Sequence, residues 1–299
     1  MAFKLVPMNV RRVLDQPPPR PIQVLPGLIR GHVGVLCGTG ASGKTTLAQQ
    51  IAVCLAAGLP TAGRLLPPPP EPIPVALVTG EEHEEIIAIR LHSIVDSLLE
   101  SEDTPLFPSI TRAEIIDRLE HGIRIFPCSG MQISLLRDGE RTEFVSELAE
   151  ALQGCHLGFV ETVSRLHDGD ENSATEMTAL VNALESVAVP TNCAIVAIHQ
   201  TSKFAALNSP DSPHAARGSA ALTDNCRWQA NLYGLSEDEA IAYGIERDRK
   251  TYLRFEITKA NYIPPYAPVW LRRMKGGVMT MIPSPTREAR SHGNSRRRR

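Results

Sequence analysis

The apolar positions of the chain gather in short runs that alternate with segments of helical spacing. Apolar runs predict buried strands at residues 33–37, 75–79, 123–126, 157–160 and 194–198. Between and after these runs, apolar residues recur every three or four positions and predict helices over residues 47–55, 87–98, 111–119, 142–153 and 177–187. Strands that alternate with helices predict an α/β fold with a mostly parallel, doubly wound sheet and right-handed crossovers.

The pattern changes toward both ends of the chain. Residues 16–21 (QPPPRP) favour extended polyproline, so residues 1–21 are predicted to form an arm or linker. Residues 201–216 lack periodicity and predict a mobile loop, after which residues 217–219 open a helical segment. From Tyr252 to residue 279 the pattern is β-rich and predicts a C-terminal extension. We expect one domain over residues 22–283 and a disordered basic tail over residues 284–299.

Four of the predicted strands lead into a polar side chain. Lys44 follows the first strand, Glu81 the second, Glu161 the fourth and Gln200 the fifth. Open α/β sheets bind their ligands at the carboxyl ends of their strands, and those ends meet at one edge. These side chains are therefore predicted to converge on one site.

Residues 38–45 (GTGASGKT) fit the pattern G-x-x-x-x-G-K-[ST] between a strand and a helix. The glycines let the backbone curl and bring its N–H groups against an anionic phosphate, at the positive end of the following helix. Lys44 would reach the β- and γ-phosphates, and the Thr45 hydroxyl would bind Mg²⁺. The residues of this segment that we expect to bind ATP are Gly38, Gly40, Ala41, Ser42, Gly43, Lys44, Thr45 and Thr46.

Hydrolysis of a nucleoside triphosphate also needs a second Mg²⁺ ligand, an oriented water and a contact to the γ-phosphate. Glu161 occupies the strand end where P-loop enzymes carry the second magnesium-binding carboxylate. Glu81 would polarise the attacking water, and Gln200 would hydrogen-bond the γ-phosphate and report its presence to the loop that follows.

The composition is that of a globular protein and excludes a disordered chain. The apolar content of 42% in 299 residues suffices for a globular core, and the net charge of −2 neither supports nor excludes a nucleic-acid partner. The six cysteines are scattered without zinc spacing and are expected to be small buried residues in a reducing compartment. No signal peptide or membrane span is evident, so we expect a cytoplasmic protein without membrane contact.

The chain resembles RecA-fold hexameric helicases, most closely the plasmid RepA-type replicative helicases. The resemblance extends from the proline run at 17–19 to about Met281. The most distinctive sequence motifs of this resemblance are Ala216-Arg217-Gly218-Ser219, Asp224-Asn225-x-Arg227-Trp228-Gln229, Lys259-Ala260-Asn261-Tyr262 and Trp270-x-Arg272-Arg273 with Gly276-Gly277-Val278. The resemblance implies a RecA-like P-loop ATPase that forms a ring, acts on single-stranded DNA and works beside a primase and an origin-binding initiator.

Carried over by position, the resemblance makes Glu81 the catalytic carboxylate and Arg90 a supporting basic residue. Arg217 matches the proposed arginine finger, which acts on the site of the neighbouring subunit. Two positions depart from the family pattern. Glu161 replaces an Asp, which puts the rate of hydrolysis in doubt, and Gln200 replaces a second His.

DNA contacts are predicted on the two loops that face the channel of such rings. Arg165, Lys203 and Phe204 are the candidate contacts. The first loop is acidic, with Asp168, Asp170 and Glu171, which is unlike a phosphate-binding surface. Two functions follow: an ATP-dependent hexameric DNA helicase of plasmid or mobile-element replication, or an ATP-binding regulator or assembly protein that acts on DNA without unwinding it.

Overall fold

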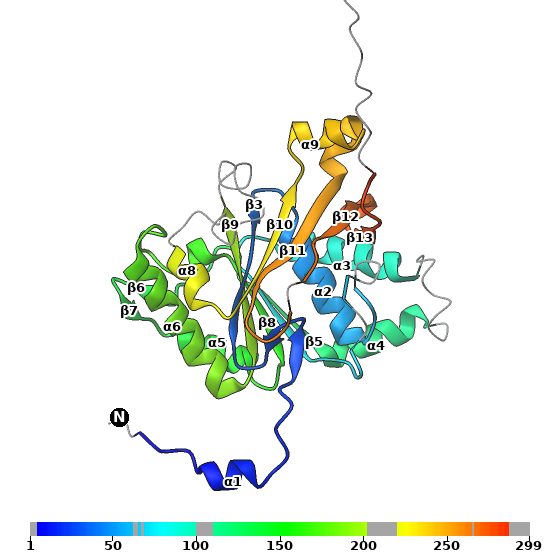
Figure 1. The fold of residues 1–299 in the computed structure, drawn as a ribbon. Coiled ribbons are helices and arrows are strands. Elements are labelled where there is room, and N and C mark those ends of the chain that lie inside the picture. The colour runs from blue at the N-terminus through cyan, green and yellow to red at the C-terminus, as the bar shows by residue number, and fades with distance from the viewer. Residues whose placement is uncertain are drawn as a thin grey trace, which may run out of the picture.

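The structure is a computed structural model that describes residues 5–61, 65–66, 69–99, 110–201, 220–264 and 266–286. Within these residues, its centre is a nine-stranded sheet with the strand order β13-β12-β11-β10-β3-β9-β8-β4-β5 (Figure 1). The strands are β3 (Val33–Thr39), β4 (Val75–Thr79), β5 (Ile123–Pro127), β8 (Leu157–Glu161), β9 (Ala194–Thr201), β10 (Trp228–Gly234), β11 (Tyr252–Ala260), β12 (Val269–Arg273) and β13 (Met279–Ile282).

The sheet has a parallel part and an antiparallel part. Strands from β10 through β3, β9, β8 and β4 to β5 run parallel. Strands β11, β12 and β13 add antiparallel pairs beyond β10. The prediction of a mostly parallel sheet with a β-rich C-terminal extension is therefore confirmed.

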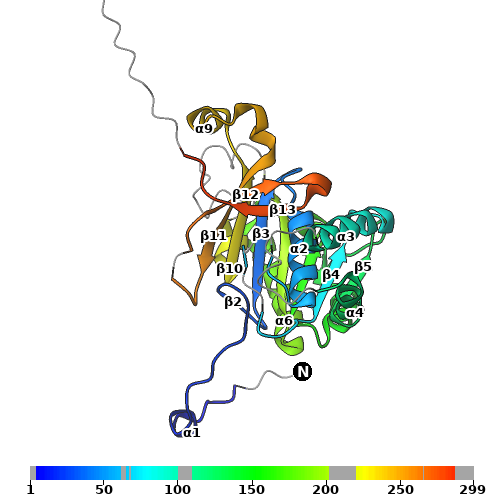
Figure 2. The ribbon, with the colours of Figure 1, turned by 90° about the vertical axis from the view of Figure 1, so that its right-hand side faces the viewer.

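Helices cover both faces of the sheet (Figures 1 and 2). One face carries α2 (Lys44–Ala57), α3 (Glu84–Leu99) and α4 (Arg112–Gly122), and the other carries α5 (Phe144–Leu152), α6 (Ala174–Thr191) and α8 (Ala220–Asn225). Smaller elements are α1 (Val10–Leu14), β1 (Gln23–Leu25), β2 (Leu28–Ile29), β6 (Leu136–Arg137), β7 (Glu140–Arg141), α9 (Glu237–Ala242) and the 3-10 turns η2 (Val163–Arg165), η4 (Glu246–Thr251) and η5 (Lys275–Gly277).

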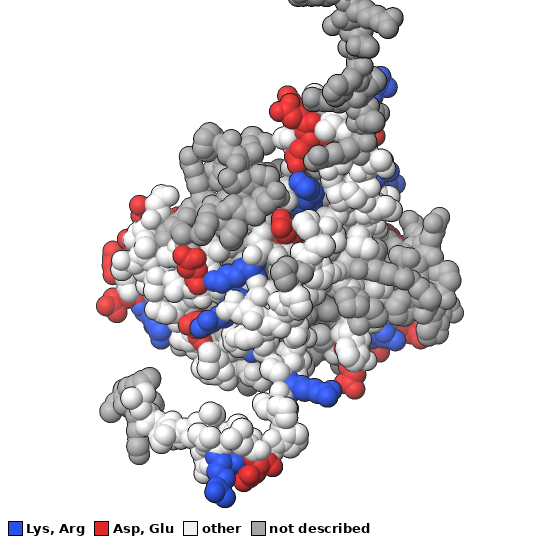
Figure 3. Space-filling model, viewed as in Figure 1, with Lys and Arg blue, Asp and Glu red and all other residues white. Residues whose placement is uncertain are grey.

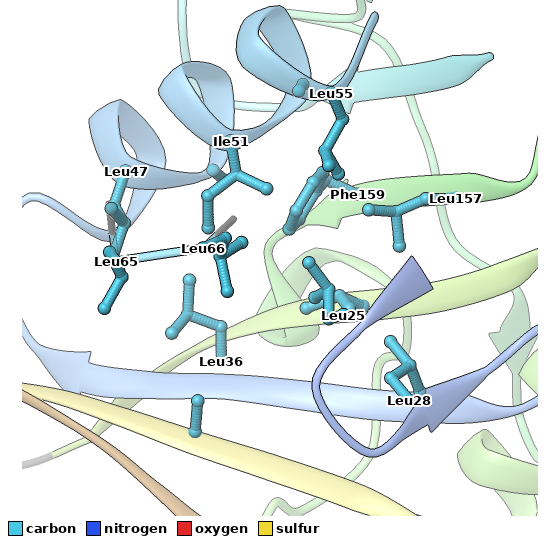
Figure 4. Close-up of a cluster of buried hydrophobic side chains, with 14 of the residues drawn as sticks. Leu25, Leu28, Leu36, Leu47, Ile51, Leu55, Leu65, Leu66, Leu157 and Phe159 are labelled. Carbon is cyan, nitrogen blue, oxygen red and sulfur yellow. The ribbon is translucent and has the colours of Figure 1, made fainter. Parts of the chain in front are cut away.

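A separate apolar core fills each side of the sheet. On the α2 side, Leu47, Ile51 and Leu55 project from one face of the helix onto Leu36 of β3 and Phe159 of β8 (Figure 4). The second core packs α5, α6 and α8 on the opposite face of the same strands. Because β3 and β8 are buried on both faces, their sequences are continuous apolar runs rather than alternating ones.

Strand β10 was not predicted, although it lies beside β3 where the sheet changes direction. Its sequence, WQANLYG, carries two polar residues inside a buried strand. The Gln229 side-chain amide donates to Asn231 Oδ1 at 2.9 Å, so these side chains satisfy part of each other's hydrogen-bonding capacity inside the fold. A sequence pattern that requires an apolar run misses such a strand.

The predicted arm contains one short helix that the proline run gave no reason to expect. Helix α1 begins after Asn9, whose side chain accepts a hydrogen bond from the Arg12 N–H at 3.0 Å. Residues 5–22 are exposed throughout. The basic tail from residue 287 lies outside the described residues, as do residues 202–216 of the predicted mobile loop and residues 217–219 after it.

Candidate functional site

The carboxyl ends of β3, β4, β8 and β9 open on a cavity of about 400 Å³. The polar residues predicted at those ends converge here as expected. The lining comprises Ala41, Gly43, Lys44, Thr45, Thr46, Glu81, Glu82, Arg90, Glu161, Thr162, Gln200, Arg273, Gly276 and Gly277. Gly38, Gly40 and Ser42 belong to the same segment but do not line the cavity.

The loop between β3 and α2 has the backbone that a phosphate cradle needs. Gly43 has a φ of +92°, and Ala41 reaches a φ of +61°, a region that costs an L-residue roughly 1–2 kcal/mol. A Cβ at Gly38 would lie 2.3 Å from the Leu232 carbonyl oxygen, so only glycine fits beside β10 there. Helix α2 starts at Lys44 and directs its free N–H groups toward the cavity.

Lys44 is buried at the floor of the cavity. Its Nζ donates to the carbonyl oxygens of Gly38 at 2.9 Å and Thr39 at 3.0 Å. Burial lowers the pKa of this ammonium, while the nearby Glu161 and Glu81 carboxylates oppose that shift. Two carbonyl contacts leave one of the three N–H donors for a phosphate oxygen.

Thr45 and Glu161 form the pair predicted to bind Mg²⁺. The Thr45 hydroxyl donates to Glu161 Oε1, and Glu161 is only 3% exposed. Its other oxygen, Oε2, is buried without a hydrogen-bond partner among the described residues. Burial, together with the Glu82 and Glu81 carboxylates, raises the pKa of Glu161 to about 7, and the Thr45 hydrogen bond and Arg90 oppose this shift.

These donors fit a hard divalent cation. An unpartnered buried carboxylate oxygen next to a hydroxyl supplies the oxygen ligands that Mg²⁺ prefers when phosphates and water complete its shell. Thr45 and Glu161 would hold the ion, which would supply positive charge to the phosphates. No cluster of three His, Cys, Asp or Glu side chains suitable for a metal occurs among the described residues.

The two adjacent carboxylates after β4 have different surroundings. Glu82 is 15% exposed, pairs with Arg90 and accepts from the Gln49 side-chain amide at 3.2 Å. Glu81 is 45% exposed and accepts from the Thr162 hydroxyl at 3.2 Å. Glu82 is the less exposed carboxylate and pairs closely with Arg90, whereas the ion pair of Glu81 with Arg165 spans 3.9 Å, so Glu81 is the carboxylate better placed to orient a water. Glu82 was not predicted, although it directly follows Glu81 in sequence.

The structure places the predicted DNA contact Arg165 beside Glu81, which lines the cavity. Its Nε lies 3.9 Å from Glu81 Oε1, and both side chains are nearly half exposed. Gln200 lies beside the loop, because a Cβ at Gly40 would come within 3.1 Å of its side-chain nitrogen. Lys203, Phe204 and Arg217 lie outside the described residues.

The C-terminal extension contributes a wall of the cavity that the sequence did not predict. Arg273, at the end of β12, donates through Nη2 to the carbonyl oxygens of Ala41 at 3.1 Å and Ser42 at 2.8 Å. Its guanidinium thus supports the loop where the backbone is left-handed. Arg273 belongs to the sequence Trp270-x-Arg272-Arg273, so the signal was present without indicating its role.

This loop, the carboxylates at the strand ends and the sheet order define a RecA-like P-loop ATPase. Residues 2–206 match the AAA domain family, and the chain belongs to that family.

Two solved structures show the same fold. The first, described as the ATPase domain of G40P, has a TM-score of 0.57 and 16% sequence identity and covers 85% of this chain and 86% of its own. The second, the RadB recombinase, has a TM-score of 0.51 and 15% identity and covers 86% of this chain and 93% of its own. In the part of the chain that the structure describes, no helix is long and apolar enough to cross a bilayer.

Proposed function

We propose that this ATPase is an ATP-dependent hexameric DNA helicase of plasmid or mobile-element replication. The observation that carries the proposal is the convergence of Lys44, Thr45, Glu81, Glu161 and Gln200 around one cavity. Together these side chains supply the functions that ATP hydrolysis requires: phosphate binding, metal binding, orientation of water and a contact to the γ-phosphate.

Among the described residues that carry the resemblance to RepA-type helicases, Lys259 contacts the end of α8, and Arg273, Gly276 and Gly277 line this cavity. Lys259 Nζ donates to the carbonyl oxygens of Thr223 at 2.9 Å and Asp224 at 2.8 Å, at the carboxyl end of α8. Helix α8 directly follows residues 202–219, which include Arg217. Lys259 would therefore anchor the helix next to the proposed arginine finger.

In the proposed cycle, Lys44 binds the β- and γ-phosphates, and Thr45 and Glu161 hold Mg²⁺. Glu81 orients the attacking water, and Arg217 of a neighbouring subunit compensates the charge of the transition state, an effect worth about 10³ to 10⁵ in rate. Gln200 reports the γ-phosphate to the loop after β9. Nucleotide binding at subunit interfaces would move that loop along single-stranded DNA, with a primase and an origin-binding initiator as separate partners.

The test is strand displacement from a forked DNA duplex by the purified protein with ATP and Mg²⁺. We expect Lys44→Ala to lower ATP turnover and displacement by at least about a hundredfold, because it removes the phosphate-binding ammonium. Lys250→Ala, at an exposed lysine of η4, is the matched control and should keep both activities. Displacement that survives Lys44→Ala would contradict the proposal.

A second experiment examines the shared site. Subunits with Lys44→Ala and subunits with Arg217→Ala should each be inactive alone. Mixed rings should regain partial ATPase activity, because some interfaces then combine an intact loop with an intact finger. Mixing that restores nothing would argue against an arginine finger in trans.

A regulator or assembly protein on DNA that does not unwind it is the second candidate. The loop after β8 supports it, because Asp168 and Asp170 are exposed, and their carboxylates accept backbone N–H groups within the protein. On the face shown in Figure 3, the acidic and basic side chains of the described residues are interspersed and form no continuous basic patch. This candidate predicts ATP binding without displacement, even when a primase and an initiator are added.

A further inference from the structure

The segment that follows β8 contacts Glu81, the carboxylate proposed to orient water. The Thr162 hydroxyl donates to Glu81 Oε1 at 3.2 Å, and Arg165 Nε lies 3.9 Å from the same oxygen. Both contacts involve Oε1, which leaves Oε2 of Glu81 for a water. Glu81 lies between β4 and α3, outside both elements, and its side chain is 45% exposed. A glutamate with that much freedom needs a partner to hold it in one rotamer.

Thr162 is held on both sides by the fold. It follows β8, whose Glu161 pairs with Thr79 of β4, and the Gly80 N–H extends this pairing to the Glu161 carbonyl oxygen at 3.1 Å. It also precedes η2, where the Arg165 N–H donates to the Thr162 carbonyl oxygen at 2.9 Å. Thr162 is only 5% exposed and lines the nucleotide cavity. Its hydroxyl therefore has a fixed place in the wall of that cavity.

Glycine at position 80 allows the two strand ends to approach each other. A Cβ at Gly80 would lie 2.8 Å from the Glu161 carbonyl oxygen and 3.0 Å from Arg165 Cδ. A contact of 2.8 Å would force a shift of the backbone, and Glu161 belongs to a strand that is buried in the sheet. Glycine is therefore required for this close packing. The packing brings the carboxylate of the next residue, Glu81, within reach of Thr162.

The Ser164 hydroxyl fixes the direction of the Thr162 proton. The two hydroxyl oxygens lie 3.1 Å apart. A carboxylate only accepts, so the Thr162 proton points to Glu81 and the Thr162 oxygen accepts from Ser164. The three side chains thus form one chain of hydrogen bonds that ends on the carboxylate. A hydrogen bond to an ionised acceptor is stronger than one between neutral groups, so this chain can hold Glu81 in one orientation.

Arg165 is the weaker of the two partners of Glu81. Its Nε lies beyond hydrogen-bond distance, and both side chains of the ion pair are nearly half exposed. Exposed ion pairs contribute little, because solvent screens the charges and two long side chains lose freedom. Thr162 is buried, reaches Glu81 at 3.2 Å and has only a short side chain to order. The hydroxyl is therefore the contact that decides where the carboxylate lies.

We propose that Thr162 is the positioning residue for Glu81 and that Ser164 orients the Thr162 hydroxyl. With Oε1 held by Thr162, Oε2 keeps a constant place from which it accepts a hydrogen bond from the attacking water. This inference rests on the proposed role of Glu81 in ATP hydrolysis and names the residue that holds it there. Because Thr162 acts through Glu81 and not on ATP, its hydroxyl should matter for the rate of hydrolysis and not for nucleotide affinity.

Single-turnover ATP hydrolysis without DNA tests the proposal, with ATP affinity measured in parallel by calorimetry. Thr162→Val keeps the shape of the side chain and removes the hydroxyl. We expect the rate to fall by about tenfold to a hundredfold, as a misplacement of about 1 Å can do, with the Kd for ATP within about twofold of the unchanged protein. Thr162→Ser retains the donor and should bring the rate to within about threefold of the unchanged protein.

Thr175→Val, at an exposed threonine of α6, is the matched control and should keep both the rate and the affinity. Two results would overturn the proposal. One is a loss of ATP affinity as large as the loss of rate in the Thr162→Val protein. The other is a Thr162→Ser protein as slow as the Thr162→Val protein, because the hydroxyl would then not be the group that counts.

A double-mutant cycle shows whether Thr162 acts through Glu81. Glu81→Ala alone should slow hydrolysis by about a hundredfold or more. In that background Thr162→Val should change the rate by less than about twofold, because no carboxylate remains to be positioned. A further loss as large as in the unchanged protein would contradict the proposal. Arg165→Ala should slow hydrolysis less than Thr162→Val does, and an equal or larger loss would make the ion pair the positioning contact instead.

These measurements separate the positioning role from the proposed function. They use no DNA, so a protein that fails to displace a strand but shows the Thr162 effect contradicts the helicase and leaves the positioning residue in place. If Glu81→Ala hydrolyses ATP as fast as the unchanged protein, the proposed role of Glu81 is wrong and the positioning role is wrong with it. If Glu81→Ala is slow while Thr162→Val is fast, only the positioning role is wrong.

Discussion

The two edges of the sheet end in different ways. At one edge, β13 is tied to the nucleotide-binding helix, because the buried Gln50 side chain of α2 donates to the Met279 carbonyl at 2.8 Å and accepts its N–H at 3.0 Å. At the other edge, β5 borders an open apolar groove. The edge at β13 is bonded to another part of the same chain, and its neighbour β12 supports the nucleotide loop through Arg273. The edge at β5 leaves apolar surface that a partner can cover.

The largest effect on stability is expected at the tied edge. Gln50→Leu would leave the buried N–H and carbonyl of Met279 without partners, at about 1–3 kcal/mol for each group. We expect the free energy of unfolding to fall by about 3 kcal/mol in urea titrations. Gln132→Leu, at the exposed rim of the open edge, is the control and should change stability by less than about 0.5 kcal/mol. Equal effects at the two positions would remove the distinction between the edges.

Strands β3, β4, β8 and β9 of the parallel part were predictable because they are buried on both faces. Continuous apolar runs follow from that burial, and polar residues at their ends follow from the place where such sheets bind ligands. Strand β10 escaped prediction because Gln229 and Asn231 pair inside the fold and interrupt the apolar run. The pattern of apolar and polar residues along the chain does not show that two polar side chains hydrogen-bond to each other inside the fold.

The residues of the site also divide into those that the sequence predicts and those that only the structure reveals. Lys44, Thr45, Glu81 and Glu161 follow strands that the sequence indicates, so their convergence could be predicted. Arg273 reaches the loop from more than 200 positions away in sequence, and only the path of β12 brings it there. Arg165 was assigned to DNA because it follows β8, but its position beside Glu81 depends on the turn η2.

The centre of the sheet differs from both edges, since it buries a carboxylate whose ionisation is costly. The pKa of Glu161 is raised from its ordinary value near 4.5 to about 7. Between these values the unfolded chain has lost the proton that the folded chain keeps, so stability without metal should fall as pH rises from about 4.5 to 7. The loss would be up to about 3 kcal/mol and should level off above pH 7.

Unfolding titrations between pH 4.5 and 8 can measure this loss, with Glu161→Gln as the comparison. The amide cannot ionise, so this part of the pH dependence should disappear. In the unchanged protein, Mg²⁺ with ATP should stabilise more strongly at pH 8 than at pH 6, because the metal needs the ionised carboxylate. The same slope in both proteins would assign the pH dependence to other groups.

A smaller effect is expected where the tied edge meets the nucleotide loop. Arg273→Ala removes two charge-assisted hydrogen bonds to loop carbonyls and leaves Ala41 to hold its left-handed conformation alone. We expect ATP to bind about tenfold to a hundredfold more weakly in calorimetric titration, which corresponds to about 1.4–2.7 kcal/mol.

Arg272→Ala is the matched control for that change. The Arg272 guanidinium lies 5.7 Å from the centre of the Tyr252 ring and does not line the cavity. It should leave nucleotide affinity within about twofold of the unchanged protein. If both arginines weaken binding equally, the extension acts through general stability and not through support of the loop.

The smallest effects on stability are expected at helix N-termini with a capping box. The hydrogen bonds of a capping box are local and do not depend on what covers the nearby edge of the sheet. Thr111 begins α4, which runs directly into β5, and Ser236 begins α9 in the segment that leads to β11. Each forms a capping box with the glutamate three residues later, so each Ala substitution should cost about 1 kcal/mol in denaturant unfolding. Near-equal losses at Thr111 and Ser236 would show that helix capping contributes equally near the two edges of the sheet. The two edges would then differ in stability through the hydrogen bonds between Gln50 and Met279. A loss at Ser236 as large as that of Gln50→Leu would mean instead that the whole extension unfolds with its caps.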